Sequence, residues 1–121
     1  MRKFAILIIA TMFAGVLAVR AFQKNSLTGQ LIDIACYTEN KANTGNDHKG
    51  RGLNCGQACA LEGFPVGLLV DGKVYQVMGE LTAHSNAKLY LHVGHTVTLA
   101  GATGDQGGHP IITATDIKET K

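Results

Sequence analysis

The stretch that decides the fold runs from residue 66 to residue 78 and reads Val66-Gly67-Leu68-Leu69-Val70-Asp71-Gly72-Lys73-Val74-Tyr75-Gln76-Val77-Met78. Two apolar runs flank Asp71-Gly72, which is the two-residue signal of a type I′ β-hairpin. The turn sets a register in which Val70 faces Lys73. Because strand side chains alternate between faces, the expected core side carries Val66, Leu68, Val70, Tyr75 and Val77.

The chain after this hairpin predicts a helical segment and two more strands. Residues 80–93 fit one short helix, although Leu89–Val93 also has the pattern of a strand. His95–Ala102 alternates in the manner of a strand, 104–108 is a glycine-rich loop, and Pro110–Ile117 is expected to be the last strand.

The chain before the hairpin predicts one strand and an insertion. Thr28–Cys36 is expected to be the first strand, after a frayed lead-in at 22–26, with Ile32, Ile34 and Cys36 on one face. The insertion, residues 34–64, begins with a long polar loop that contains His48 and ends with a short helix.

The expected helix of the insertion has clear boundary signals. Asn54 is a good N-cap, Gln57 completes a capping-box pattern, and Gly63-Phe64-Pro65 stops the helix. Helical spacing places Cys55 and Cys59 on one side, one turn apart.

These elements predict a mainly β fold. The expected architecture is a small five-stranded, OB-like Greek-key barrel, with the loop-helix insertion after strand 1 and a short helix between strands 3 and 4. An irregular β-sandwich is the alternative. Residues 22–121 form the single expected domain, and the chain shows no internal repeat.

The first 21 residues are expected to be a signal peptide. Met1-Arg2-Lys3 is a basic start, Phe4–Val19 is uncharged and apolar, and Val19-Arg20-Ala21 fits a cleavage site. The apolar run is shorter than the roughly 20 residues of a membrane span. We therefore expect export to the periplasm or medium, with no stable membrane span after cleavage. An uncleaved N-terminal anchor is the alternative.

Cleavage also removes the apparent basicity of the chain. The full sequence has 11 Lys and Arg against 9 Asp and Glu. Removing Arg2, Lys3 and Arg20 leaves eight basic residues against the same nine acidic ones, a net charge of −1. Nothing in this charge favours nucleic acid, and with few aromatic residues the stacking surfaces of nucleic-acid-binding barrels are scarce.

The candidate site residues all lie in the insertion. Cys36, His48, Cys55 and Cys59 form a Cys₃His set that suits zinc, and thiolates also suit copper in the Cu(I) state. An oxidising compartment favours instead a disulfide from Cys36 to Cys55 or Cys59, with the third cysteine left as a thiol. Thiol redox chemistry with Cys55 as nucleophile is a third interpretation.

The same residues carry a family resemblance. The ordered set Asp33, Cys36, His48, Cys55, Cys59, Gly63, Pro65 and Gly67, together with D-G-K-V-Y and G-H-T-V-T-L-A-G, is similar to a group of small exported bacterial proteins. The resemblance covers residues 28–117 and implies an OB-like barrel and export, but no activity. In this chain six residues separate His48 from Cys55, more than in the family pattern.

The sequence favours a non-enzymatic binding or accessory protein of the cell envelope, with an envelope protein as its expected partner. The other histidines, His84, His92, His95 and His109, are expected to be surface residues, and Asp33 a hydrogen-bond partner of the insertion backbone. A carbohydrate- or peptide-binding barrel with structural cysteines is a further alternative.

Overall fold

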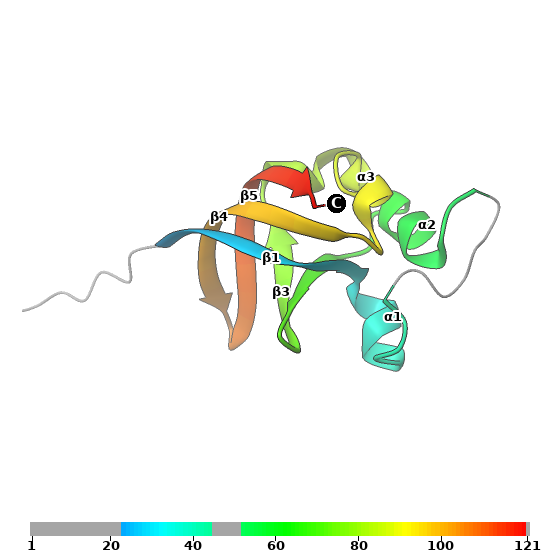
Figure 1. Ribbon diagram of the computed structural model, residues 1–121, viewed down its shortest axis with the longest axis horizontal. Helices are drawn as coiled ribbons and strands as arrows, with labels where there is room; N and C mark the ends of the chain where they lie inside the picture. Colours follow the sequence, from blue (N-terminus) through cyan, green and yellow to red (C-terminus); the bar gives the residue numbers. More distant parts are fainter. Residues whose placement is uncertain (1–22, 45–51, 121) are drawn as a thin grey trace, which may run out of the picture.

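The computed structural model describes residues 23–44 and 52–120 (Figure 1). The strands are β1 (Gln23–Asp33), β2 (Val66–Val70), β3 (Lys73–Met78), β4 (Thr96–Gln106) and β5 (His109–Glu119). The helical elements are α1 (Ile34–Glu39), α2 (Cys55–Leu61), η1 (Glu80–Thr82), α3 (Ala83–Asn86) and η2 (Tyr90–His92), of which η1 and η2 are 3₁₀ turns.

The five strands form one sheet that closes into a ring. Its order is β1-β2-β3-β5-β4, and β4 pairs with β1 to complete it. The β3–β5 pairing is parallel and the other four pairings are antiparallel. The mainly β prediction is therefore confirmed, as are the five strands.

The hairpin that anchors the sequence argument is confirmed. Val70 pairs with Lys73 and Leu68 with Tyr75. Asp71 and Gly72 both have positive φ, 49° and 78°, as a type I′ turn requires. The turn chemistry thus fixes the register of β2 against β3.

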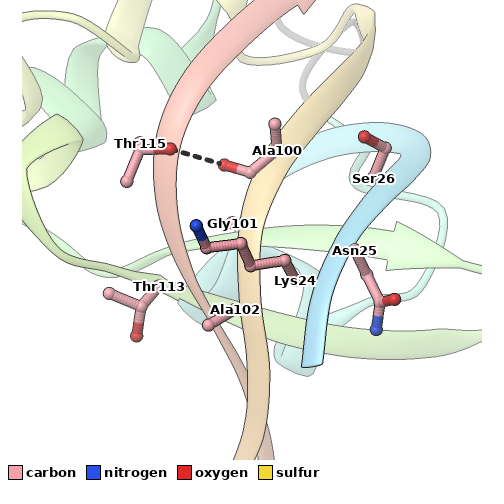
Figure 2. Close-up of a pocket in the computed structure, with 8 residues that line it drawn as sticks. All are labelled: Lys24, Asn25, Ser26, Ala100, Gly101, Ala102, Thr113 and Thr115. Carbon is pink, nitrogen blue, oxygen red and sulfur yellow. Dashed lines mark hydrogen bonds between the residues drawn. The ribbon is translucent and has the colours of Figure 1, made fainter. Parts of the chain in front are cut away.

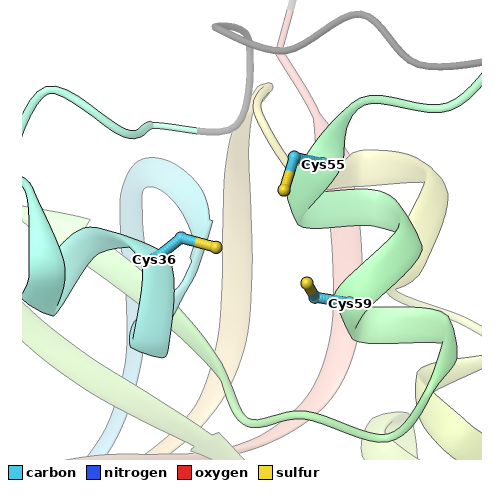
Figure 3. A group of neighbouring side chains, drawn as sticks. All are labelled: Cys36, Cys55 and Cys59. Atoms are coloured by element: carbon cyan, nitrogen blue, oxygen red, sulfur yellow. The ribbon is translucent and has the colours of Figure 1, made fainter.

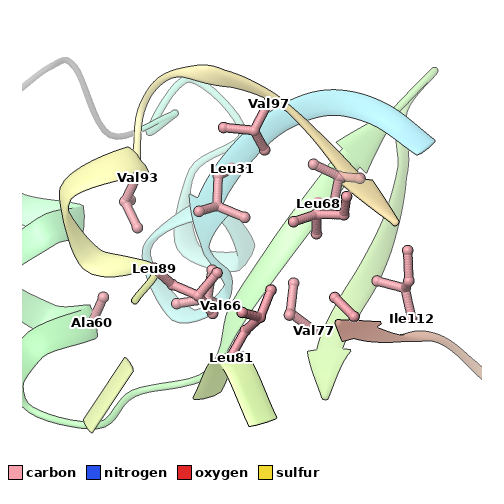
Figure 4. Packing of buried hydrophobic residues seen from close by; sticks show 12 residues of the cluster. Leu31, Ala60, Val66, Leu68, Val77, Leu81, Leu89, Val93, Val97 and Ile112 are labelled. Atoms are coloured by element: carbon pink, nitrogen blue, oxygen red, sulfur yellow. The ribbon is translucent and has the colours of Figure 1, made fainter. Parts of the chain in front are cut away.

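The predicted core face of the hairpin also points inward (Figure 4). Val66, Leu68 and Val77 are buried, and Val70 and Tyr75 pack against the same cluster. The helical elements contribute to this core as well, through Ala60, Leu81, Leu89 and Val93. Because α2 supplies Ala60, the insertion is packed onto the ring rather than appended to it.

The first strand differs from the prediction at both ends. It begins at Gln23, where a frayed lead-in was expected, because the segment pairs with β4 from Gln23 opposite Thr103 onward. It ends at Asp33, whose Oδ1 accepts a hydrogen bond from the Cys36 N–H at 2.9 Å and so caps α1. Cys36 therefore lies on a helix, and the expected role of Asp33 as a backbone partner is confirmed.

The predicted shared face of Ile32, Ile34 and Cys36 is wrong, because only Ile32 belongs to the strand and the other two lie in α1. Leu31 and Ile32, which point to opposite faces of β1, are both fully buried, and Leu31 belongs to the central core cluster. A Cβ built on Gly67 would lie 2.9 Å from Ile34 Cγ1 and 2.8 Å from Val74 Cγ1. The glycine in β2 thus leaves the space into which α1 places Ile34.

The connection between β3 and β4 is three short pieces rather than one helix or a strand. Glu80–Thr82, Ala83–Asn86 and Tyr90–His92 are separate turns. His84, Ser85 and Asn86 all have φ between 55° and 58°, a left-handed turn of three non-glycine residues. Such residues rarely adopt this conformation, which explains why the sequence pattern did not indicate it.

The last two strands are longer than predicted. β4 continues through residues 104–106 of the expected loop, and only Gly107 and Gly108, with φ of 59° and 86°, form the turn to β5. Their pairing shifts register between Ala100 and Gly101.

Within the described ranges, no helix is long and apolar enough to cross a membrane. The predicted signal peptide at 1–21 lies outside those ranges.

Candidate metal centre

The three cysteines come together between α1 and α2 (Figure 3). Their Sγ atoms all lie within 4.8 Å of one another. Cys36 and Cys59 are partly buried, whereas Cys55 is exposed. The sequence-based prediction that these residues form one cluster is therefore confirmed for the three sulfurs.

The capping box positions the two cysteines of α2. Asn54 Oδ1 accepts a hydrogen bond from the Gln57 N–H at 2.7 Å, and Gln57 Oε1 accepts one from the Asn54 N–H at 3.2 Å. The box was predicted from the sequence and is confirmed. It starts the helix at Cys55, so Cys55 and Cys59 lie on the side that faces α1.

Side-chain amides hold α2 against the connection between β3 and β4. Gln57 Nε2 donates to the Leu91 carbonyl at 2.9 Å, and Asn54 Nδ2 donates to the Val93 carbonyl at 2.9 Å. These contacts join residues more than 30 positions apart, so they set the place of the helix in the fold.

Asn86 holds the other end of α2 and was missed by the sequence argument. Its Nδ2 donates to the Ala60 carbonyl at 2.8 Å and to the Phe64 carbonyl at 3.0 Å. The Ala60 carbonyl, in the last turn of the helix, also accepts from the Gly63 N–H at 3.0 Å, and the Phe64 carbonyl lies just after the helix. Only the left-handed turn at 84–86, which the sequence does not reveal, places the amide there.

A buried carboxylate adjoins the three sulfurs. Asp33 is 2% exposed, and its Oδ2 has no hydrogen-bond partner among the described residues. The ion pairs found in the described part of the chain involve only Glu119 and two histidines, so none neutralises Asp33. Buried charges without a partner are rare in proteins, and the position next to a thiol cluster makes Asp33 part of the site.

Burial and this carboxylate set the protonation of two thiols. Burial, followed by the adjacent carboxylate of Asp33, raises the pKa of Cys36 from 9.0 to about 12. Burial and Asp33 also raise the pKa of Cys59. Both residues are therefore thiols, not thiolates, at neutral pH.

The predicted disulfide is not present. All three cysteines are free, and no pair of their sulfurs is at bonding distance. The physical reason is local: Cys36 lies on α1 rather than at a strand end, so its thiol approaches two sulfurs of α2 together instead of pairing with one.

The spacing of the sulfurs fits metal ligation. A tetrahedral zinc site with Zn–S bonds of about 2.3 Å has sulfurs about 3.8 Å apart. Sulfurs within 4.8 Å of one another reach that spacing through small side-chain rotations. The predicted fourth ligand, His48, lies in residues 45–51, outside the described part of the structure.

Two of the other histidines bind one carboxylate. His92 Nδ1 lies 2.8 Å from Glu119 Oε2, and His95 Nδ1 lies 3.0 Å from Glu119 Oε1. The hydrogen bonds from both imidazoles lower the pKa of Glu119. The three side chains are partly or fully exposed, which agrees with the expected surface role, and they tie the end of β5 to η2.

A groove of about 440 Å³ lies elsewhere, over strands β1, β4 and β5 (Figure 2). Lys24 extends along it, and its floor includes Gly101, where a Cβ would lie 2.1 Å from the Thr113 carbonyl oxygen. None of its lining residues belongs to the cysteine cluster. In the alternative in which the barrel binds a carbohydrate or peptide, the ligand would bind in this groove. That alternative stays a prediction.

No family model, curated protein or solved structure matches this chain. The resemblance to small exported bacterial proteins consequently stays a prediction, and the case for function rests on the geometry of the site.

Proposed function

We propose that this protein is a small exported binding protein whose three cysteines hold one thiophilic metal ion. The observation that carries the proposal is the convergence of Cys36, Cys55 and Cys59, with sulfurs within 4.8 Å, from two separate helices. Thiolates select soft and borderline ions such as Zn²⁺ and Cu(I). The expected physiological role is to bind or pass on that ion in the cell envelope, with an envelope protein as partner.

The protonation of the site disfavours thiol redox chemistry. A redox cycle would use Cys36 or Cys59 as resolving or leaving thiol, and a thiol of high pKa is a poor leaving group. The pKa of both residues is raised. A bound ion, in contrast, brings positive charge that offsets the thiolates it forms.

The fold supports the role of a rigid scaffold. The strand order, the parallel β3–β5 pair and the helical elements between β3 and β4 support the proposal of an OB-like barrel. In such an arrangement the closed sheet supports the insertion between β1 and β2. The positions of the three sulfurs are then fixed by the ring and by the side-chain amides of Asn54, Gln57 and Asn86, which hold α2.

Metal reconstitution tests the proposal. The mature chain, reduced and kept free of oxygen, is equilibrated with Zn²⁺ or with Cu(I), desalted, and examined by elemental analysis, thiol counting and native mass spectrometry. We expect one ion per chain and the loss of three reactive thiols. The variants Cys36→Ser, Cys55→Ser and Cys59→Ser should each weaken binding at least about tenfold.

Ala58→Ser is the matched control, because Ala58 is an exposed residue of the same helix. It should bind as the wild type does. Three reactive thiols with no retained ion, or equal binding in the serine variants and the wild type, would contradict the proposal. His48→Ala tests the predicted fourth ligand separately: it should weaken Zn²⁺ binding if the imidazole completes a tetrahedral site.

A further inference from the structure

We propose that the ion this site prefers is a trivalent, three-coordinate thiophilic element, of the class of trivalent arsenic and antimony, held as a neutral trithiolate. This inference rests on the proposed function, whose site it shares. Two independent observations carry it: the number of donor atoms and the charge beside them.

Among residues 23–44 and 52–120, the number of converging donor atoms is three. The cluster contains Cys36, Cys55 and Cys59, and no histidine, aspartate or glutamate of residues 23–44 and 52–120 joins it within the same distance. Asp33, whose carboxylate lies beside Cys36, is not one of the ligand group. Structural zinc sites take four protein ligands, whereas a trivalent group-15 centre makes three bonds to sulfur and directs a lone pair to the fourth side.

The charge of the site favours a higher-valent ion. Three thiolates around a monovalent ion carry a net charge of −2, around a divalent ion −1, and around a trivalent centre zero. Asp33 is buried next to them, and its Oδ2 has no partner in the described structure. Each added negative charge there is repelled in a medium of low dielectric constant. The neutral trithiolate avoids this repulsion.

The exposure of the sulfurs gives an order of binding. Cys55 is exposed, and Cys36 and Cys59 are partly buried. Trivalent arsenic enters as its neutral trihydroxide and meets Cys55 first. Three As–S bonds form and three As–O bonds break, each thiol proton leaves with a hydroxide as water, and no atom is oxidised or reduced.

Titration with arsenite tests the inference. The full mature chain, reduced with a phosphine so that no added thiol competes, is titrated with arsenite and, separately, with Zn²⁺. We expect one arsenic per chain, the loss of three reactive thiols, and a mass gain equal to one arsenic atom less three hydrogen atoms. Arsenite should also displace bound Zn²⁺.

Single Cys→Ser variants should each lose at least about tenfold in arsenite affinity, since one anchored bond is lost. Asp33→Asn tests the charge argument, because asparagine keeps the N-cap but removes the charge. At pH 7 it should strengthen Zn²⁺ binding about tenfold, which corresponds to one pKa unit of interaction, and change arsenite binding less than about threefold. Circular dichroism checks that each variant is folded.

The outcomes separate the two proposals. If Zn²⁺ or Cu(I) binds to the three cysteines and arsenite does not displace it, or if arsenite consumes only two thiols, the preference for a trivalent centre is wrong and the metal-binding function stands. If no ion binds, both are wrong. Equal effects of Asp33→Asn on Zn²⁺ and on arsenite would contradict the charge argument.

Discussion

At the scale of single residues, Asp33 links the fold to the site. One carboxylate oxygen caps α1 and so turns the chain out of β1. The other is buried without a hydrogen-bond partner in the described part of the chain and acts on the neighbouring thiols. The same side chain therefore places Cys36 and adds to the effect of burial in raising its pKa.

Replacing Asp33 separates these two roles. In Asp33→Asn the cap persists, but the charge that contributes to the raised pKa of Cys36 is gone. We expect that pKa to fall from about 12 while staying above 9.0, since burial is the larger cause. Alkylation rates of Cys36 against pH, followed by mass spectrometry, measure the shift. An unchanged profile would mean that Asp33 does not act on this thiol.

The sequence could indicate some of these residues and not others. The cysteines, the hairpin turn and the capping box were visible because each depends on a short local pattern. The role of Asn86 was not visible, because it depends on a left-handed backbone at residues 84–86, where no glycine indicates it. Cys36 was assigned to a strand because Ile32 and Ile34 have β propensity, which the cap formed by Asp33 overrides.

At the scale of elements, α2 is the part of the site that must be held in place. It has only seven residues, too few to be stable by itself in water. The capping box fixes its start, and Asn86 fixes its end. The strain of three left-handed residues is thus balanced by contacts that position two of the three sulfurs.

Substitutions in the left-handed turn should have opposite effects at adjacent positions. Asn86→Ala removes two hydrogen bonds to buried or partly buried carbonyls and should destabilise the protein by about 2 kcal/mol, with weaker metal binding. Ser85→Gly keeps these bonds and relieves a positive φ at an exposed residue, so it should stabilise by up to about 1 kcal/mol. Urea denaturation measures both, and destabilisation by Ser85→Gly would argue against strain in the turn.

The lengths of elements were harder to predict than their existence. β4 continues past the predicted strand end at Ala102 through Gly104 to Gln106, where the glycine-rich sequence suggested a loop. It does so because pairing with β5 satisfies the backbone groups of both strands. The single helix predicted at 80–93 is wrong for a different reason. The apolar residues of this connection follow a helical spacing, but Leu81, Leu89 and Val93 enter the core from separate short turns.

At the scale of the whole molecule, the thiols connect the stability of the fold to pH. The pKa of Cys36 is about 12 in the folded protein, against an ordinary value of 9.0 for a cysteine thiol. A raised pKa of this kind contributes stability that is fully present below pH 9 and is lost as the pH rises toward 12. Cys59 contributes in the same direction.

The metal-free protein should therefore lose stability between about pH 9 and pH 12. Cys36→Ser should show a smaller loss over the same window, because serine does not ionise there. Melting temperatures of both proteins, measured across that range without metal, test this. Parallel curves for the two proteins would show that Cys36 does not contribute to the alkaline loss.

The close packing at Gly67 restricts which residues homologous chains can have at this position. A Cβ built on residue 67 would lie only 2.9 Å from Ile34 Cγ1. In any homologous chain, a larger residue at the position of Gly67 must be accompanied by smaller ones at the positions of Val74 and Ile34; otherwise α1 moves and carries Cys36 away from Cys55 and Cys59. The positions of Gly67 and Ile34 should therefore covary among homologues that keep all three cysteines, and should vary independently among those that have lost Cys36.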